Sequence, residues 1–144
     1  MTELKQRAAQ KILATALKVA REKNLKPLAV AVYDARGSLK AFAAEDGTSL
    51  KRGEIAMGKA YGALALGVPS RAIGKMAAER PHFVAAVTHA VGGSLVPVPG
   101  GVLIRDRKGE IAGAVGISGD TSDNDEMAAV AGIEAAGMAA ETGA

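Results

Sequence analysis

The sequence predicts an α+β fold in which helices flank one antiparallel sheet of five strands. Three observations lead to this prediction. The chain starts with an amphipathic helical pattern, its apolar runs fall into two groups joined by glycine-containing turns, and it ends in an alanine-rich helical segment. Its 144 residues are the length of one domain, so residues 1–144 are expected to share a single core.

The first helix is expected over residues 2–24, where apolar side chains recur every three or four positions. Thr2 is the expected N-cap of this helix. Two apolar runs follow, over residues 28–32 and 38–44, and the segment 33–37 between them contains a glycine. This pattern predicts a β-hairpin.

A long helix is expected next. It would begin at Thr48 or Ser49 and end at Leu66, because Gly67 is a typical C-terminal stop. Three glycines lie inside this helix, at Gly53, Gly58 and Gly62. Each costs about 1 kcal/mol relative to alanine. We therefore expect another backbone or a ligand to approach the helix closely.

The second half of the chain is predicted to hold the other three strands. The expected elements are a short helix from Pro69 or Ser70 to about Arg80, a helical turn within 82–93, strands over 94–98, 101–105 and 110–117, a loop over 120–125, and a helix over 123–140. Asp123 and Glu126 have the spacing of a capping box. Gly113 and Gly116 lie inside the strand 110–117, where glycine marks a bulge or a close approach by a ligand or chain.

The composition excludes several kinds of site. Without cysteine there are no disulfides, thiolate metal sites or cysteine nucleophiles, and two histidines are too few for a multi-histidine metal centre. Aromatic residues make up only 3% of the chain, which disfavours the base-stacking surfaces of single-strand-binding proteins. There is no run of 18 apolar residues and no apolar segment near the start. We expect a cytoplasmic protein that binds neither nucleic acid nor membrane.

Four carboxylates gather between the last strand and the last helix: Asp120, Asp123, Asp125 and Glu126. Their spacing does not match an EF-hand loop. Acidic side chains at a helix N-terminus contribute about 0.3–1 kcal/mol each, so a structural role and no metal are expected. A second interpretation is that Ser118 and Thr121, with the backbone amides of residues 122–124, line a ligand pocket.

His82 and His89 are the chain's only histidines, and on a helix their spacing of seven places them on nearly the same face. Either imidazole could act as a general base or bind haem iron. The alternative is a surface or hydrogen-bonded histidine near a turn. Together they are the strongest chemical candidates in the sequence.

Three further side chains could hold an anionic group. Lys59 and Tyr61 lie on the glycine-rich helix, where the lysine could reach a pocket and meet a carboxylate, or extend to solvent. Arg105 could hold a carboxylate with its guanidinium, or be a surface charge at a strand end. The sequence has no Gly-x-Ser-x-Gly elbow and no phosphate-binding Gly-x4-Gly-Lys-Ser/Thr motif, which disfavours serine hydrolases and ATPases.

Several segments carry a resemblance to a known family. They are VAVYDARG (30–37), Lys59-Ala60, PGGVLIRD (99–106), GEIAGAVGISGDT (109–121), and then Asp125 and Glu126. Over nearly its whole length the chain resembles the GlcG/HbpS family, which includes the C-terminal domain of PduO-type proteins. The resemblance implies a profilin-like fold, homo-oligomers and, in several members, haem binding. Other relatives look like enzymes of aromatic degradation that act on unstable ring-cleavage products.

The resemblance also bears on the ligands of a haem iron. Haem-binding relatives of the PduO type are expected to have a histidine on the first helix, and this chain has none before His82. The cofactor is therefore unassigned. A haem site would need a partner subunit or one of His82, His89, Met57, Tyr33 and Tyr61.

Two functions are expected from these features. The first is a small-molecule-binding protein that holds haem, or another flat carboxylated molecule, between the strand containing Gly116 and the helix 48–66. The alternative is a small hydrolase or isomerase for unsaturated acid or imine intermediates, with a histidine as general acid and base. The expected ligand-binding residues are Lys59, Tyr61, Arg105, Gly116, Ser118 and Thr121, and the expected catalytic residues are His82, His89, Asp120 and Asp125. An oligomeric scaffold without a ligand is a third possibility.

Overall fold

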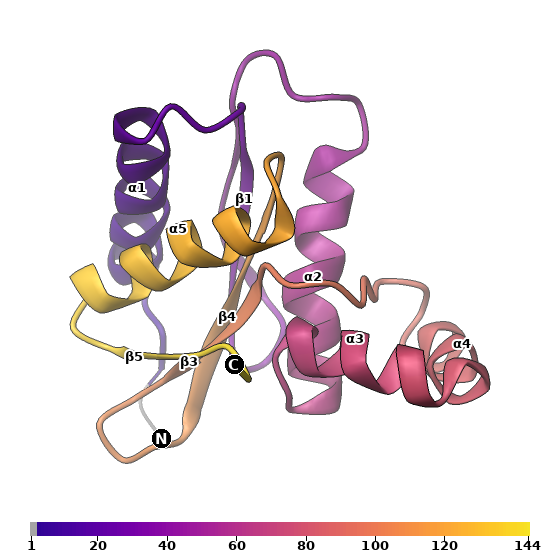
Figure 1. Cartoon of the computed structure of the whole chain (residues 1–144). Helices are drawn as coiled ribbons and strands as arrows, with labels where there is room; N and C mark the ends of the chain where they lie inside the picture. Colours follow the sequence, from indigo (N-terminus) through magenta and orange to yellow (C-terminus); the bar gives the residue numbers. More distant parts are fainter. Residues whose placement is uncertain (1–2) are drawn as a thin grey trace.

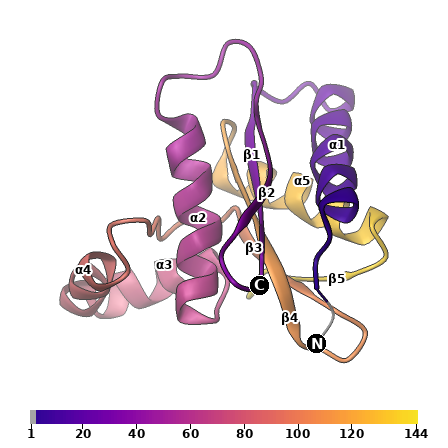
Figure 2. The ribbon, with the colours of Figure 1, turned by 180° about the vertical axis from the view of Figure 1, so that it is seen from behind.

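A five-stranded antiparallel sheet lies between two helical layers in the computed structural model of the chain, which describes residues 3–144 (Figures 1 and 2). The strands are β1 Ala29–Asp34, β2 Leu39–Ala44, β3 Gly101–Arg105, β4 Ile111–Ser118 and β5 Ala139–Glu141. The helices are α1 Gln6–Glu22, α2 Arg52–Leu66, α3 Ser70–Glu79, α4 Pro81–Ala90 and α5 Ser122–Ala135. The strand order is β2-β1-β4-β3-β5, with antiparallel pairing throughout. This confirms the predicted α+β class.

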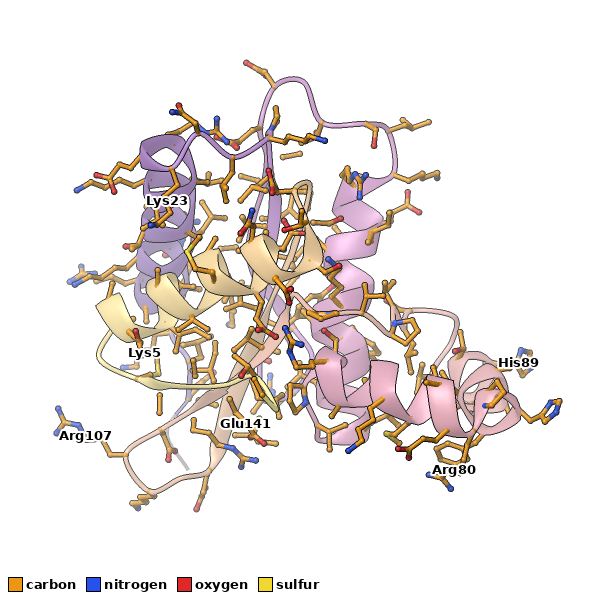
Figure 3. All side chains as sticks on the ribbon, in the orientation of Figure 1. Lys5, Lys23, Arg80, His89, Arg107 and Glu141 are labelled. Atoms are coloured by element: carbon orange, nitrogen blue, oxygen red, sulfur yellow. The ribbon has the colours of Figure 1, made fainter. Side chains whose placement is uncertain are left out.

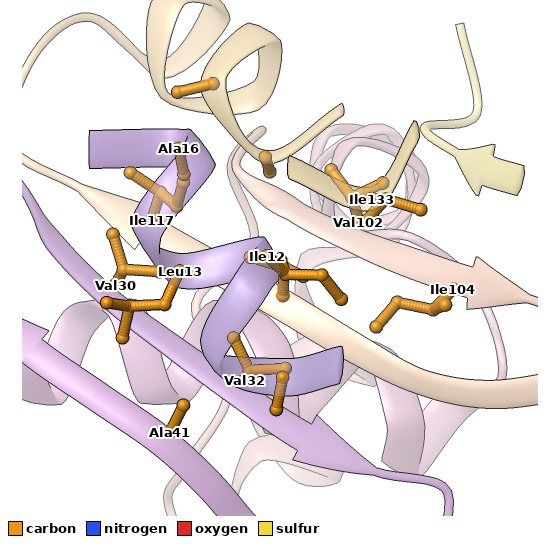
Figure 4. Packing of buried hydrophobic residues seen from close by; sticks show 14 of the residues in the cluster. Ile12, Leu13, Ala16, Val30, Val32, Ala41, Val102, Ile104, Ile117 and Ile133 are labelled. Atoms are coloured by element: carbon orange, nitrogen blue, oxygen red, sulfur yellow. The ribbon is translucent and has the colours of Figure 1, made fainter. Parts of the chain in front are cut away.

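The two faces of the sheet carry side chains of different size. Large branched side chains face α1 and α5, and Figure 4 shows Ile12 and Leu13 of α1 packed over Val30 and Val32 of β1. Alternate positions of the same strand, Ala29 and Ala31, face α2 on the other side. Because side chains alternate along a strand, one short sequence builds both layers.

Small residues let α2 lie unusually close to its neighbours. A Cβ added at Gly116 of β4 would lie 1.9 Å from the carbonyl oxygen of Ala56, and one added at Gly62 would lie 3.1 Å from the Cα of Leu95. The expected close approach at these glycines is therefore made by the chain itself. It leaves no space for a ligand between β4 and this part of α2.

Both hairpin turns use the same side-chain device. The Asp34 carboxylate accepts the backbone N–H groups of Arg36 and Ser38, at 3.0 Å each. The Asp106 carboxylate accepts those of Lys108 and Glu110, at 2.9 and 3.0 Å. An aspartate that bonds the backbone two residues ahead favours a turn, which explains why both hairpins were predictable.

The strand expected over residues 94–98 does not form. This segment lies against α2, where Leu95 is buried and the Val96 N–H donates to the Gly58 carbonyl. Pro97 and Pro99 have no N–H to donate to a strand ladder. The prediction was wrong because it rested on the apolar run alone and did not take into account the N–H groups that the two prolines lack.

The fifth strand comes instead from the end of the predicted last helix. Helix α5 ends at Ala135, and Gly137 adopts a left-handed φ of 79° that turns the chain back. Residues 139–141 then pair with β3. The expected helix to residue 140 was therefore too long, although the number of strands was right.

Three helix starts also differ from expectation. The α5 N-cap is Thr121, whose hydroxyl accepts the Asn124 N–H, rather than Asp123. The α2 N-cap is Lys51, without a side-chain bond, rather than Thr48 or Ser49. The α1 N-cap is Lys5, and the expected cap Thr2 lies outside the described residues. The helical turn expected within 82–93 is the ten-residue helix α4, which packs on α3.

Candidate functional site

Lys59 and Asp125 form a buried ion pair where α2, β4 and the start of α5 meet. The lysine Nζ lies 3.3 Å from Asp125 Oδ2 and donates to the Ile117 carbonyl at 2.8 Å. The other carboxylate oxygen accepts the Asp120 N–H at 2.9 Å. The side chains are only 3% and 2% exposed. Lys59 therefore connects three elements from inside the core and does not extend to solvent.

The environment of this pair pushes both groups toward their neutral forms. Burial lowers the pKa of Lys59, and the nearby Asp125 carboxylate opposes that shift. Burial likewise raises the pKa of Asp125, against the Asp120 amide and the Lys59 ammonium. The charged form of each group is stabilised by the other, and such pairing is the condition under which a buried charge is tolerated.

Ser118 and Arg52 form a second contact at the same end of β4. The buried Ser118 hydroxyl accepts from Arg52 Nη1 at 3.1 Å, and Arg52 is the first residue of α2. The arginine also repels Lys59 and so contributes to the lowered pKa of that lysine. The predicted residues Lys59, Gly116, Ser118, Asp120, Thr121 and Asp125 thus come together around one end of the sheet.

Asp120 is a hydrogen-bonding hub in the loop between β4 and α5. Its carboxylate accepts the backbone N–H groups of Lys26 and Thr121, at 2.8 Å each, and the Asn124 side-chain amide at 2.7 Å. These bonds, led by the Lys26 amide, lower the pKa of Asp120 to about 2. This carboxylate holds the loop in place while it is ionised.

Replacing Asp120 with asparagine should lower the free energy of unfolding by about 1 kcal/mol at pH 7, a value reduced for solvent screening. The folded-state pKa lies below the unfolded value of 3.8, so the stabilisation is present above about pH 4 and is lost as the pH falls through about 2. Urea unfolding of both proteins from pH 7 to pH 2 should show the difference shrinking. The exposed Asp46→Asn variant is the control, and a difference that persists undiminished at pH 2 would contradict this role.

Two carboxylates in the first turns of α5, Asp123 and Glu126, are bound to α3. Arg71 donates to both Glu126 oxygens, at 3.1 Å each, and also pairs with Asp123. These two partners raise the pKa of Arg71. No group of three or more potential ligands for a metal ion occurs among residues 3–144.

Two of the predicted ligand-binding residues are engaged in packing or pairing elsewhere. The Tyr61 ring packs edge to face against Tyr33, with centroids 5.9 Å apart. The Arg105 guanidinium pairs with Glu141 of β5 at 2.8 Å and donates to the Gly109 carbonyl. The first contact joins α2 to β1 and the second joins β3 to β5, and neither involves Lys59 or Asp125.

His82 and His89 lie on the exposed surface of α4. Figure 3 shows His89 pointing away from the body of the molecule, on the side opposite Lys5. Neither imidazole has a hydrogen-bond partner within the described part of the chain. The structure therefore does not bring the histidines together with Asp120 and Asp125.

A groove that the sequence did not indicate lies on the opposite side, between α1 and the end of α5. It has a volume of about 450 Å³, within the range of small-molecule sites. Its lining comes from six residues at and before the start of α1, from Ala112 of β4, and from Ala136 and Met138 after α5. The floor is apolar (Leu4, Ala8, Ala112, Ala136 and Met138), and three cations, Lys5, Arg7 and Lys11, line it together with Glu3. Met57, another side chain considered for iron, lines a separate cavity of about 300 Å³ beside Gly92 and Gly93.

Three solved structures are similar to this one. PduOC, solved as a haem complex, has a TM-score of 0.85 at 22% identity, covering 98% of this chain and all of that chain. The protein ORFY of Klebsiella pneumoniae has a TM-score of 0.83 at 22% identity, covering 95% and 93%. A double mutant of HbpS from Streptomyces reticuli has a TM-score of 0.78 at 25% identity, covering 93% and 87%. No curated protein matches the chain.

The sequence itself identifies the family. Residues 4–134 match the family described as "Haem degrading protein HbpS-like", which confirms the resemblance found in the sequence. Within residues 3–144, no helix has the length and apolar character needed to span a membrane. Because the matched segment includes every element from α1 to nearly the end of α5, the chain belongs to the HbpS-like family.

Proposed function

We propose that this chain is a small-molecule-binding protein whose ligand is a flat amphipathic carboxylate, with haem as the first ligand to test. The groove beside α1 is the observation that carries this proposal. Its apolar floor suits the body of such a molecule, and its cations suit the carboxylates. The family description and the haem complex of the similar PduOC support haem as the ligand.

The groove residues fit haem in two respects. Leu4, Ala8 and Met138 offer a surface for a porphyrin face, while Lys5 and Lys11 stand where propionates would find opposite charge. Met138 also supplies a thioether, one of the side chains that ligate haem iron in proteins. Bound haem would supply a redox-active iron. The protein's own contribution is to shield one face of the ring and to neutralise the propionates.

In this proposal the two histidines do not ligate the haem iron. They lie on α4, across the molecule from the groove, and neither lines it (Figure 3). A haem bound in the groove should therefore keep its affinity when both histidines are removed. This expectation separates a groove site from a surface site on α4.

The test is a haem titration followed by Soret absorbance, with wild type beside His82→Ala/His89→Ala and Met138→Leu. We expect a saturable shift at one equivalent that is unchanged in the histidine variant and altered in position in Met138→Leu. Light scattering on the same samples tests the implied homo-oligomer, which would have a mass above the 14.5 kDa of one chain.

Two results would contradict the proposal. A wild type that shows no saturable shift would remove haem as the ligand. A shift abolished by the histidine substitutions would move the site to α4.

The enzymatic alternative has less support from the geometry. A general acid or base must come within hydrogen-bond reach of its substrate, at about 2.6–3.2 Å. The exposed His82 and His89 face neither the groove nor the carboxylates of Asp120 and Asp125. The binding function is therefore the conclusion that the site supports best.

A further inference from the structure

A second, polar cavity lies at the other end of α1, between the loop that follows β2 and the end of β4. Its volume is about 210 Å³. It is lined by Lys26, Pro27, Gly47, Thr48, Ser49, Arg52 and Gly119. Its lining holds two cations and no carboxylate-bearing residue. It is distinct from the groove beside α1, which uses the first half of α1 and shares none of these residues.

Neither cation of this cavity forms a close ion pair in the described chain, although the Lys26 ammonium also attracts the Asp120 carboxylate. Arg52 donates one hydrogen bond, to the Ser118 hydroxyl, and forms no ion pair among residues 3–144. The Lys26 ammonium likewise makes no ion pair there. An arginine fork with most of its donors unused is the group that binds carboxylate or phosphate oxygens best.

The neighbouring carboxylates are already engaged elsewhere. Glu45 pairs with Arg21 at 3.1 Å and accepts the Leu28 N–H, and Glu54 pairs with Lys51 at 2.9 Å. Asp125 is bound to Lys59. Asp120 follows Gly119 directly and lies beside the cavity, but its carboxylate already accepts the backbone amides of Lys26 and Thr121 and the side-chain amide of Asn124. None of these acids forms an ion pair with Arg52.

The surrounding backbone favours an anion as well. Gly47 and Gly119 line the cavity with positive φ values of 91° and 153°, a backbone conformation that favours glycine. The cavity also lies beside the first turn of α2, whose N-cap Lys51 contributes no side-chain bond. The cavity therefore lies beside the positive N-terminal end of a 15-residue helix.

We propose that this cavity is a binding site for a small oxyanion, the phosphate or carboxylate end of a small molecule, held by the Arg52 guanidinium with help from Lys26. Its volume accommodates one such group and not a porphyrin. The anion would sit between the loop 47–49 and the end of β4.

The test is an amide-resolved NMR titration at constant ionic strength, with sodium phosphate in one arm and sodium acetate in the other. Sodium chloride is the reference anion. We expect saturable shifts of the Gly47, Thr48 and Gly119 amides, and the arm with the tighter binding identifies which oxyanion the site prefers. Arg52→Gln should weaken binding at least tenfold.

Two further variants make the result decisive. Lys51→Gln removes the neighbouring exposed cation and should leave the affinity within twofold of wild type. Arg52→Lys keeps the positive charge but lacks the planar guanidinium, and it should weaken binding about three- to tenfold. It also provides a folded variant for the test if Arg52→Gln fails to fold. The proposal is overturned if neither phosphate nor acetate shifts these amides saturably, or if the Arg52 variants bind as tightly as wild type. Haem affinity is measured separately at the groove, so loss of one site does not imply loss of the other.

Discussion

Replacing Lys59 with methionine should lower the free energy of unfolding by about 3–5 kcal/mol, the largest loss expected from a single side chain here. Methionine fills much of the same volume, so packing changes little. The Asp125 carboxylate, however, would stay buried without its cation, and the Ile117 carbonyl would lose its donor. Because domains of this size have about 5–15 kcal/mol of stability, urea unfolding should show a large shift of the midpoint.

The second half of the pair provides the decisive control. Lys59→Met/Asp125→Asn should recover at least half of the loss, since an amide still accepts the Asp120 N–H and carries no buried charge. The exposed ion pair between Lys51 and Glu54 gives the matched comparison. Lys51→Met should change the free energy of unfolding by less than about 0.5 kcal/mol, because an exposed ion pair contributes little to stability. A Lys59→Met protein within about 1 kcal/mol of wild type would refute the structural role of the pair.

Gly116→Ala is expected to destabilise the protein by about 3 kcal/mol although it adds only one methyl group. The new Cβ would lie 1.9 Å from the Ala56 carbonyl oxygen and 2.8 Å from the Ala60 nitrogen. Both atoms belong to the backbone of α2, so no side-chain rotation can relieve the contact and the helix must move off the sheet. Thermal and urea unfolding would measure the loss.

Gly53→Ala is the matched control on α2, and it should have the opposite sign. There the added Cβ meets the far end of the Phe42 ring, which is 40% exposed and free to turn outward. Alanine also favours the helix over glycine by about 1 kcal/mol. If Gly116→Ala proves as stable as Gly53→Ala, the close approach of α2 and β4 is not what positions this end of the sheet.

The parts of the fold that were predictable are those specified by nearby residues. The two hairpins follow from apolar runs on either side of the Asp34 and Asp106 turns, whose carboxylates bond the backbone locally. Helix α2 ends at Leu66, as predicted, because Gly67 adopts the left-handed φ of 71° that its sequence position indicates. Such features depend only on a few consecutive residues.

The missed elements depend on contacts between distant segments. Residues 139–141 read Ala-Ala-Glu, a helix-favouring sequence, yet they pair with β3 because Gly137 ends α5. The overlooked signal was that glycine. The apolar pattern of residues 94–98 is typical of a strand. Pro97 and the following Pro99, however, have no backbone N–H to donate to a neighbouring strand.

The candidate sites also show that local features are predictable from the sequence and that contacts between distant segments are not. Lys59 and Asp125 were each predicted as functional, but their pairing across 66 positions was not, because nothing local to either residue indicates the other. The groove could not be predicted for the same reason. Its cations lie at the start of the chain, while Met138 lies near its end. The signal available in advance was the cluster Lys5, Arg7 and Lys11 on the first helix, which by itself reads as a solvated face.

The most direct test of the central claim is the haem affinity of a variant in which the rim charges of the groove are reversed, Lys5→Glu/Arg7→Glu/Lys11→Glu. The control is Lys18→Glu/Lys75→Glu/Lys108→Glu, which makes the same change in net charge at exposed positions outside the groove. Soret titrations should show affinity reduced at least tenfold by the rim reversal and changed less than threefold by the control. Equal affinities in the two variants would show that the ligand does not bind in the groove.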